Sequence, residues 1–347
     1  MTVRITWKRV LAALLALALA GLAVGWSGAV NVAASSGHWP VTDWFLHWVM
    51  RNSVKTRSHF DAPKQPADAT GLVSAAGHFA ASCAVCHGAP GLGASPVARA
   101  ATPPAPDLSV NAREWNDRHL FWILKHGVKF SGMPAWPAQD REDEVRRMVA
   151  LVRRLPGMTP EMFAQLTGGA AAIAGSNRFE TCAGCHGSDG RGRGQGDIPV
   201  LGGQRFEYLL ASLKAYRTGD RHSAVMGNAV ARLSEADMRA LAARFAAMPG
   251  LGAPAGGSDP EAERIVREGL PDRELPACAS CHAPNKPYPV LNGQKAAYVA
   301  GRLRRWRGDE TVVDARKTHA TMPVIARRIP EEMIDRLARY YAGQARN

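Results

Sequence analysis

Three copies of one five-residue pattern constrain this chain more than any other feature. Each copy has two cysteines separated by two residues and followed at once by histidine. The copies are Cys83-Ala84-Val85-Cys86-His87, Cys182-Ala183-Gly184-Cys185-His186 and Cys278-Ala279-Ser280-Cys281-His282. The 347 residues include six cysteines, so the pattern uses all of them and leaves none for a free thiol or an interdomain disulfide.

This pattern is typical of covalent haem attachment. Two thiols about one helical turn apart can form thioethers to the two vinyl groups at one porphyrin edge, and the adjacent histidine is then the proximal iron ligand. We therefore predict three covalently bound haem c groups, with His87, His186 and His282 as iron ligands. A zinc half-site or a redox dithiol would explain one copy, but three copies that use every cysteine argue against both.

A sixth iron ligand is expected in each domain, because a haem that only transfers electrons usually has both axial positions filled. The candidates are Met133, Met226 and Met322, which lie 46, 40 and 40 residues after the respective histidines. We expect each methionine on a loop, followed by a helix over residues 140–155, 234–248 or 330–342. The alternative, that they only fill gaps in a core, suits the methionines inside helical patterns better. Four histidines near these loops are interpreted as surface or neighbouring residues: His119, His126, His222 and His319.

The spacing of the motifs predicts one small domain per haem. The intervals between the first cysteines are 99 and 96 residues, much longer than a solenoid repeat. A second element, Leu201-Gly202-Gly203-Gln204 with Tyr208, recurs as Leu291-Asn292-Gly293-Gln294 with Tyr298, so the second and third domains are predicted to be duplicates. Glycine and proline runs mark the links, strand patterns are sparse, and we expect an all-α chain with domains at residues 69–158, 170–249 and 260–347.

The amino terminus predicts a membrane anchor within residues 1–36. Arg4, Lys8 and Arg9 precede an apolar run that contains no charged residue before Asp43, and about 20 apolar residues suffice to cross a bilayer. The basic flank predicts a cytoplasmic amino terminus, which places the haem domains on the periplasmic side of a bacterial inner membrane. The alternative is a signal peptide cleaved after residue 20.

Residues 37–68 are expected to form an interfacial or linker segment. Four aromatic side chains precede a group of cations, an arrangement that suits the membrane surface; the aromatics are Trp39, Trp44, Phe45 and Trp48. A helix packed on the first domain or on a partner subunit explains the same pattern. The formal net charge of +13 favours anionic partners, such as phospholipid headgroups or an acidic redox protein. Nucleic acid is excluded, because no binding motif is present and the basic residues are scattered.

The motifs resemble known cytochrome families. The second and third domains are similar to the two-haem bacterial cytochromes of the c-four type, in the attachment motifs, the Leu-x-Gly-Gln-x-x-x-Tyr element, Met226 and Met322. Segments 103–108, 120–127 and 132–136 resemble class I cytochrome c domains from cytochrome subunits of membrane-bound dehydrogenases. The resemblance spans roughly residues 70–345 and implies three tandem class I cytochrome c domains after the anchor.

The same resemblance implies a function in electron transfer. Three-haem subunits of periplasmic alcohol, aldehyde and gluconate dehydrogenases take electrons from a catalytic subunit and pass them to ubiquinone or onward to an oxidase. We therefore expect a catalytic dehydrogenase subunit or another redox protein as the partner, with quinone or a terminal oxidase as the acceptor. The alternatives are a shuttle to a terminal oxidase, or a haem peroxidase or reductase, which needs an open iron position. The third domain has Ala283 where the others have glycine, so one side of its haem should be covered differently.

Overall fold

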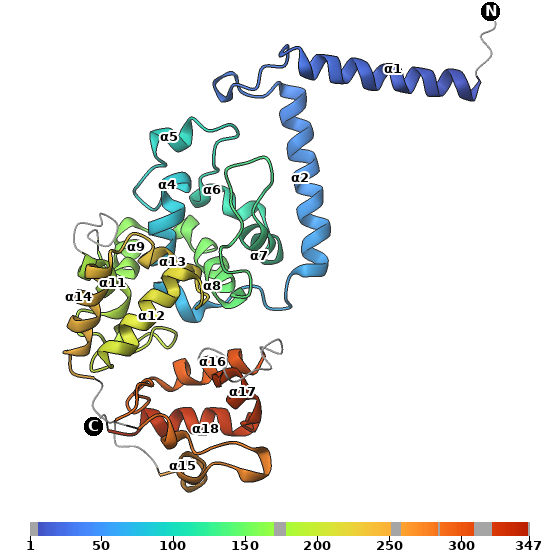
Figure 1. The fold of residues 1–347 in the computed structure, drawn as a ribbon. Coiled ribbons are helices and arrows are strands. Elements are labelled where there is room, and N and C mark those ends of the chain that lie inside the picture. The colour runs from blue at the N-terminus through green and yellow to red at the C-terminus, as the bar shows by residue number, and fades with distance from the viewer. Residues whose placement is uncertain (1–5, 170–177, 251–257, 284, 309–320, 346–347) are drawn as a thin grey trace, which may run out of the picture.

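The computed structural model describes residues 6–169, 178–250, 258–283, 285–308 and 321–345 (Figure 1). Within these residues the chain is helical and contains no β-strand, only two isolated bridges, Ala89 with Leu92 and Leu270 with Leu275. The predicted all-α fold class, with an apolar helix at the amino terminus, is confirmed.

Two long helices precede three groups of shorter ones. The long helices are α1 (Trp7–Trp26) and α2 (Pro40–Asp61). Module one (residues 69–167) contains α3 (Leu72–His78), the π-helical segment η3 (Phe79–Cys83), α4 (Ala84–His87), α5 (Pro96–Arg99), α6 (Leu108–Asn111), α7 (Asp117–His126), α8 (Glu142–Val152) and α9 (Pro160–Thr167). Module two (residues 178–248) contains α11 (Arg178–His186), α12 (Phe206–Thr218), α13 (Ala224–Val230) and α14 (Glu235–Ala246). Module three (residues 259–343) contains α15 (Pro260–Glu268), α16 (Ala296–Arg307), α17 (Thr321–Arg328) and α18 (Glu331–Ala342).

In each module the last long helix packs on the helix at the module's start. In modules one and three, α8 contacts α3 and α18 contacts α15. In module two, the rings of Phe179 on α11 and Phe245 on α14 lie 5.5 Å apart between centroids. Each module has its own cluster of buried apolar side chains. The predicted helices after the three methionines are therefore present as α8, α14 and α18, and each packs on the first helix of its module.

Helix α2 joins the amino-terminal segment to module one. Its carboxyl-terminal half contacts α7 through the buried residues Val54 and Ser58, and Arg118 of α7 donates a hydrogen bond to the carbonyl of His59 at 2.7 Å. Its amino-terminal half extends beyond this contact (Figure 1). The alternative of a helix packed on the first domain thus holds for the second half of α2, whereas its first half carries the exposed aromatic side chains.

Two of the three candidate ligand methionines are not on loops. Met133 lies on a loop as expected, but Met226 lies inside α13 and Met322 inside α17, so the expectation of a loop was wrong for these two. Short-range chemistry explains the helices. The hydroxyl of Ser223 caps α13 by accepting a hydrogen bond from the Met226 amide at 3.1 Å, and Pro323 stands in the first turn of α17, where proline is tolerated.

Candidate haem sites

The first two attachment motifs lie at the ends of helices. In module one, α3, η3 and α4 form a nearly continuous helical stretch that ends at His87, and in module two α11 ends at His186. Gly88 and Gly187 follow with φ of 69° and 80°, positive values that glycine adopts readily because it has no Cβ atom. The helices therefore bring each pair of thiols and the following histidine together within about two turns.

The third motif is built differently. Helix α15 ends at Glu268, and Cys278–Ser280 form a single 3-10 turn nine residues after the end of α15. Gly269 makes the break, because its φ is 80° and a Cβ atom there would lie 2.2 Å from the carbonyl oxygen of Leu275. The third motif therefore differs from the other two in its backbone as well as in having Ala283 in place of glycine.

A proline carbonyl orients the ring of two of the three histidines. Nδ1 of His87 lies 2.9 Å from the carbonyl oxygen of Pro106, and Nδ1 of His282 lies 2.9 Å from that of Pro289. A carbonyl can only accept, so Nδ1 carries the proton and Nε2 is left with its lone pair available to a metal. Metal-binding histidines are commonly held in this way.

In module two a proline carbonyl also lies near the histidine, but the geometry of the contact is less favourable. The carbonyl of Pro199 acts on His186, although the buried Nδ1 of His186 lacks a geometrically good hydrogen bond within the described part of the chain. These prolines were missed in the sequence analysis. The signal that could have found them is a shared Pro-x-Leu, which occurs at Pro106, Pro199 and Pro289.

Burial keeps two of the histidines neutral. It lowers the pKa of His186 to about 4 against the opposing effect of the Pro199 carbonyl, and it also lowers the pKa of His282. A neutral imidazole is the form that ligates a metal. The histidines are therefore ready to bind iron without first losing a proton at neutral pH.

The cysteines do not have the properties of a redox dithiol. Burial raises the pKa of Cys83 to about 12 and that of Cys182 and Cys185 to about 11, whereas a reactive thiol needs a lowered pKa. No disulfide joins the six cysteines. The described residues also contain no group of three or more His, Cys, Asp or Glu side chains arranged to hold a metal ion.

Each candidate methionine lies in the module of its histidine and is half-buried. Met133 packs on the core of module one together with Cys83, and Met322 packs on the core of module three together with Cys278. The nearby histidines lie at the surface. His126 and His222 are exposed, and Nδ1 of His222 lies 3.0 Å from an Asp140 carboxylate oxygen. His119 is half-buried beside the Trp115 ring, and His319 lies outside the described residues.

The duplicated Gln residues join modules two and three through reciprocal hydrogen bonds. Gln294 accepts from the amide of Val200 at 2.9 Å and donates to its carbonyl at 3.1 Å. Gln204 makes the same two bonds with Val290, at 2.9 and 3.1 Å. Each valine follows one of the prolines described above. The repeated element therefore forms an approximately two-fold interface that holds the two histidine-orienting loops together.

The residue after each glutamine extends this symmetry. Lys295 donates to the three carbonyls of Gly192, Gln195 and Ile198 in module two, at 2.6 to 3.0 Å. In the reciprocal position, Arg205 donates to the carbonyl of Ala283 in module three at 2.8 Å. The interface is thus made largely of backbone carbonyls and long side chains from the opposite module.

The interface also carries an excess of positive charge that suits haem. Arg221 bonds to the hydroxyls of Tyr208 and Tyr298, one from each module, at 3.4 and 3.1 Å. The Nε atoms of Arg221 and Arg302 are buried without a hydrogen-bond partner among the described residues. Burial and the charge of Arg221 lower the pKa of Arg302. Haem propionates are anions that accept such N–H groups, so the residues present fit the cofactor.

Helical modules with a Cys-x-x-Cys-His motif and an oriented histidine define a c-type cytochrome, which binds haem c covalently. Residues 72–152 match the family model described as cytochrome c oxidase, cbb3-type, subunit III, and residues 172–243 match the model described as cytochrome c. The chain belongs to the cytochrome c family, in the group that includes cytochrome c4 and the thiosulfate dehydrogenase electron acceptors. It is an electron-transfer protein and not a catalytic enzyme.

Three relatives illustrate this group. The chain is 30% identical to a thiosulfate dehydrogenase electron acceptor of Thiomonas intermedia, over 47% of this chain and 78% of the relative. It is 31% identical to cytochrome c4 of Stutzerimonas stutzeri, over 50% of this chain and 88% of the relative. The solved structure of reduced cytochrome c4 from Pseudomonas stutzeri matches with a TM-score of 0.42 and 31% identity, over 50% of this chain and 98% of that one.

Proposed function

We propose that this protein is a membrane-anchored, periplasmic three-haem cytochrome that accepts electrons from a catalytic dehydrogenase and passes them to quinone or the respiratory chain. Each module would hold one haem c. The thioether residues are Cys83, Cys86, Cys182, Cys185, Cys278 and Cys281, and the iron ligands are His87 with Met133, His186 with Met226, and His282 with Met322. When bound, each haem supplies one iron that alternates between the ferrous and ferric states.

The proposal rests on one observation: all three modules contain the same set of candidate haem-binding residues. Each module combines the two cysteines, a histidine acted on by a proline carbonyl and a half-buried methionine. The residues at each site have distinct roles. The thioethers retain the cofactor, the proline carbonyl orients the imidazole, and the arginines at the interface of modules two and three balance propionate charge. A filled sixth position favours electron transfer over reaction with a substrate.

Relatives support a dehydrogenase as the electron donor. Two of them are named thiosulfate dehydrogenase electron acceptors, so an enzyme that oxidises a small periplasmic substrate is the donor class we propose. Helix α1 supports the membrane location, because an 18-residue window of its 20 residues has a mean hydropathy of 2.0 and none of its residues is buried in the structure. A second apolar stretch, Ala69–His87, lies partly in the core of module one.

A shuttle to a terminal oxidase is the second candidate. The match of module one to the subunit III model of a cbb3-type oxidase favours it. In that role the protein would carry electrons from a quinol-oxidising complex and would have no stoichiometric dehydrogenase partner. The two candidates therefore differ in what copurifies with the chain, and not in the haem sites.

Two measurements test the proposed function. The haem content of the purified protein, together with its intact mass, should give three covalent haems per chain, and changing both Cys278 and Cys281 to alanine should leave two. Purification from gently solubilised membranes should then recover a dehydrogenase subunit in stoichiometric amount. Recovery of oxidase subunits instead would favour the shuttle, and a chain with three haems that no dehydrogenase can reduce would refute the first candidate.

A further inference from the structure

The helical stretch that carries the first attachment motif is also the surface on which module two rests. Helix α3 contacts α11 and α13, and η3 contacts α13 as well. Helix α11 carries Cys182 and Cys185, and α13 carries Met226. One continuous stretch that ends at the first haem motif therefore packs on both elements that bear the candidate residues of the second haem.

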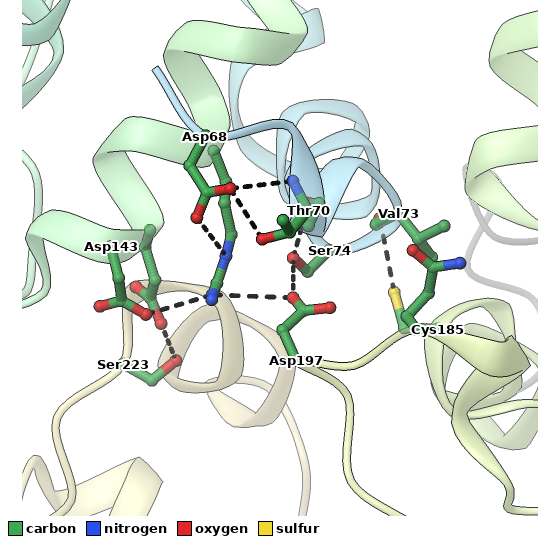
Figure 2. A network of polar contacts seen from close by, with 12 residues as sticks. Asp68, Thr70, Val73, Ser74, Asp143, Cys185, Asp197 and Ser223 are labelled. Carbon is green, nitrogen blue, oxygen red and sulfur yellow. Dashed lines mark hydrogen bonds and ion pairs between the residues drawn. The ribbon is translucent and has the colours of Figure 1, made fainter. Parts of the chain in front are cut away.

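Cys185 lies close to α3. Its Sγ is 4.0 Å from the carbonyl oxygen of Val73 on α3, and Figure 2 shows the side chain pointing toward that carbonyl. A Cβ atom built on Gly77, one turn further along α3, would lie only 2.9 Å from the same Sγ. In a c-type site this sulfur is bonded to the porphyrin, so it marks an edge of the second haem. No side chain at position 77 separates that edge from α3.

A second glycine, the residue directly after module one, meets α11. Gly168 follows α9 with φ of 78°, and a Cβ atom there would lie 2.8 Å from Cα of Gly184, the residue before Cys185. Arg193 of module two fastens this contact by donating to the carbonyls of Leu166 and Gly184 at 2.9 and 2.6 Å. Backbone from module one and from Gly168 therefore lies against two successive residues of the second attachment motif.

Buried charges hold this contact in place (Figure 2). The Asp197 carboxylate of module two, whose side chain is 6% exposed, accepts a hydrogen bond from Ser74 at 2.7 Å and lies 3.6 Å from Arg147. Glu144 of module one, whose side chain is 3% exposed, accepts from the Ser223 hydroxyl at 2.6 Å and the Ala224 amide at 2.8 Å. These interactions hold α3 against module two on two sides. Asp197 acts beside Cys185, and Glu144 acts at the start of α13.

We infer that electrons pass between the first and second haems across the contact of α3 with Cys185, and that Gly77 is the positioning residue that keeps this approach close. The inference rests on the proposed electron-transfer function. The step moves one electron from ferrous iron of one haem to ferric iron of the other and needs no proton or co-reactant. With modules two and three joined through Gln204 and Gln294, the second haem is the central one of the relay.

The test is made on the full-length protein in a Met133→His background. Histidine in place of methionine lowers the potential of the first haem, so an electron delivered there by pulse radiolysis moves on to the others. Gly77→Ala is added and compared with Gly301→Ala, a helical glycine on α16 whose added Cβ would meet nothing within 4 Å. Both changes raise helix propensity alike. We expect the concentration-independent transfer from the first haem to slow several-fold with Gly77→Ala and to stay unchanged with Gly301→Ala.

Further variants and readouts keep the inference open to refutation. Asp197→Asn removes the charge that pairs with Arg147 and should also slow this transfer, while three haems remain bound and the spectra of the second and third stay unchanged. An unaltered rate in both Gly77→Ala and Asp197→Asn, at full haem content, would overturn the inference and leave the proposed function standing. A parent protein with three haems but no intramolecular transfer would instead contradict the proposed function.

Discussion

Under the proposed ligation, the sulfur of each candidate methionine closes one haem iron to small ligands. We expect Met133→Ala, Met226→Ala and Met322→Ala each to convert one haem to a high-spin form that binds cyanide rapidly, because alanine cannot reach the iron. Absorption and EPR spectra of the oxidised protein measure the change. The matched controls are the buried core residues Met148 and Met333. Their change to leucine should cost less than about 1.5 kcal/mol and leave all three haem spectra as they were.

The result can also go against these assignments. If a methionine variant keeps the spectrum of the parent, that methionine fills a core gap and another residue ligates the iron. A high-spin haem in the unmodified protein would indicate an open iron position and would favour the alternative of a haem peroxidase or reductase. Because each variant affects a different module, the three methionine assignments are tested independently.

At the residue scale, the sequence supports a prediction where covalent chemistry fixes the spacing of the residues. Cys83, Cys86 and His87 can be recognised because the thioether chemistry demands that spacing. The backbone carbonyl of Pro106 escaped notice, since any residue has a carbonyl and only the fold aims this one at an imidazole. The shared Pro-x-Leu marks these prolines as a repeated feature, but it does not show that their carbonyls face the histidines 19, 13 and 7 residues earlier.

At the scale of elements, the paired loops of modules two and three depend on two glutamine side chains. Gln294 is 5% exposed and Val200, its partner, is 1% exposed. Gln294→Ala leaves the Val200 amide and carbonyl buried without partners, which should cost about 1–3 kcal/mol. We expect the Val200 amide to lose its protection from hydrogen exchange, while the Val290 amide keeps its own. Gln204→Ala should give the reverse pattern.

Gln139 provides the control for this experiment. It is exposed and donates to the carbonyls of Lys125 and Trp136 inside module one, so Gln139→Ala should alter neither valine. Full protection of both amides in the Gln204→Ala and Gln294→Ala variants would show that the reciprocal bonds do not hold the interface.

Helices could be predicted from the sequence where neighbouring residues determine them. The helices after the methionines were expected from apolar periodicity, and α8, α14 and α18 lie where they were predicted. The short helices around Met226 and Met322 were not, because their starts depend on a single cap or on a proline in the first turn. The separation of α15 from the third motif was also not foreseen, because it follows from the backbone conformation of Gly269.

At the scale of the whole molecule, one carboxylate links the outer modules. Asp143 on α8 lies 2.8 Å from Arg305 of module three and also pairs with Arg141 and Arg147. These partners are 162, 2 and 4 residues away in the chain. No sequence pattern predicts the pairing with Arg305. The ion pairs between modules were therefore beyond prediction, although the basic character of the chain was plain.

Asp143 should make the stability of the assembly depend on pH in acid. Burial tends to raise its pKa, but the hydrogen bonds and charges of its arginine partners lower it well below the ordinary value. A group with a lowered pKa stabilises the folded state above its unfolded pKa, about 3.9, and loses this effect as the pH falls through the folded value. We expect Asp143→Asn to lower the guanidinium midpoint at pH 7 by the equivalent of about 2 kcal/mol, and to differ progressively less from the parent below pH 3.9.

The comparison of midpoints needs a control, because other carboxylates titrate in the same range. Asp272 is exposed, so Asp272→Asn should track the parent at every pH. A gap between parent and Asp143→Asn that stays constant from pH 7 to pH 3 would contradict the role given to the carboxylate.

Under the proposed membrane location, the exposed face on the first half of α2 should meet the lipid surface. At helical spacing, one broad face on the first half of the helix carries five exposed apolar side chains: Val41, Trp44, Phe45, Trp48 and Val49. Helix α1 ends 14 residues before α2 begins and would hold this face at the bilayer surface. Tryptophan is favoured at that depth, where its ring meets the headgroups.

Removal of residues 1–26 isolates the contribution of α2. We expect the shortened protein to bind anionic phosphatidylglycerol vesicles reversibly, with its tryptophan emission moving to shorter wavelength. Burial of a large apolar side chain is worth about 1.5–3 kcal/mol, so Trp44→Ser with Trp48→Ser should weaken binding by about tenfold or more. Val97→Ser, an exposed apolar position on α5, should have no effect. Equal binding by the parent and the double variant, or binding abolished by salt alone, would mean that charge and not the aromatic face attracts the protein to lipid.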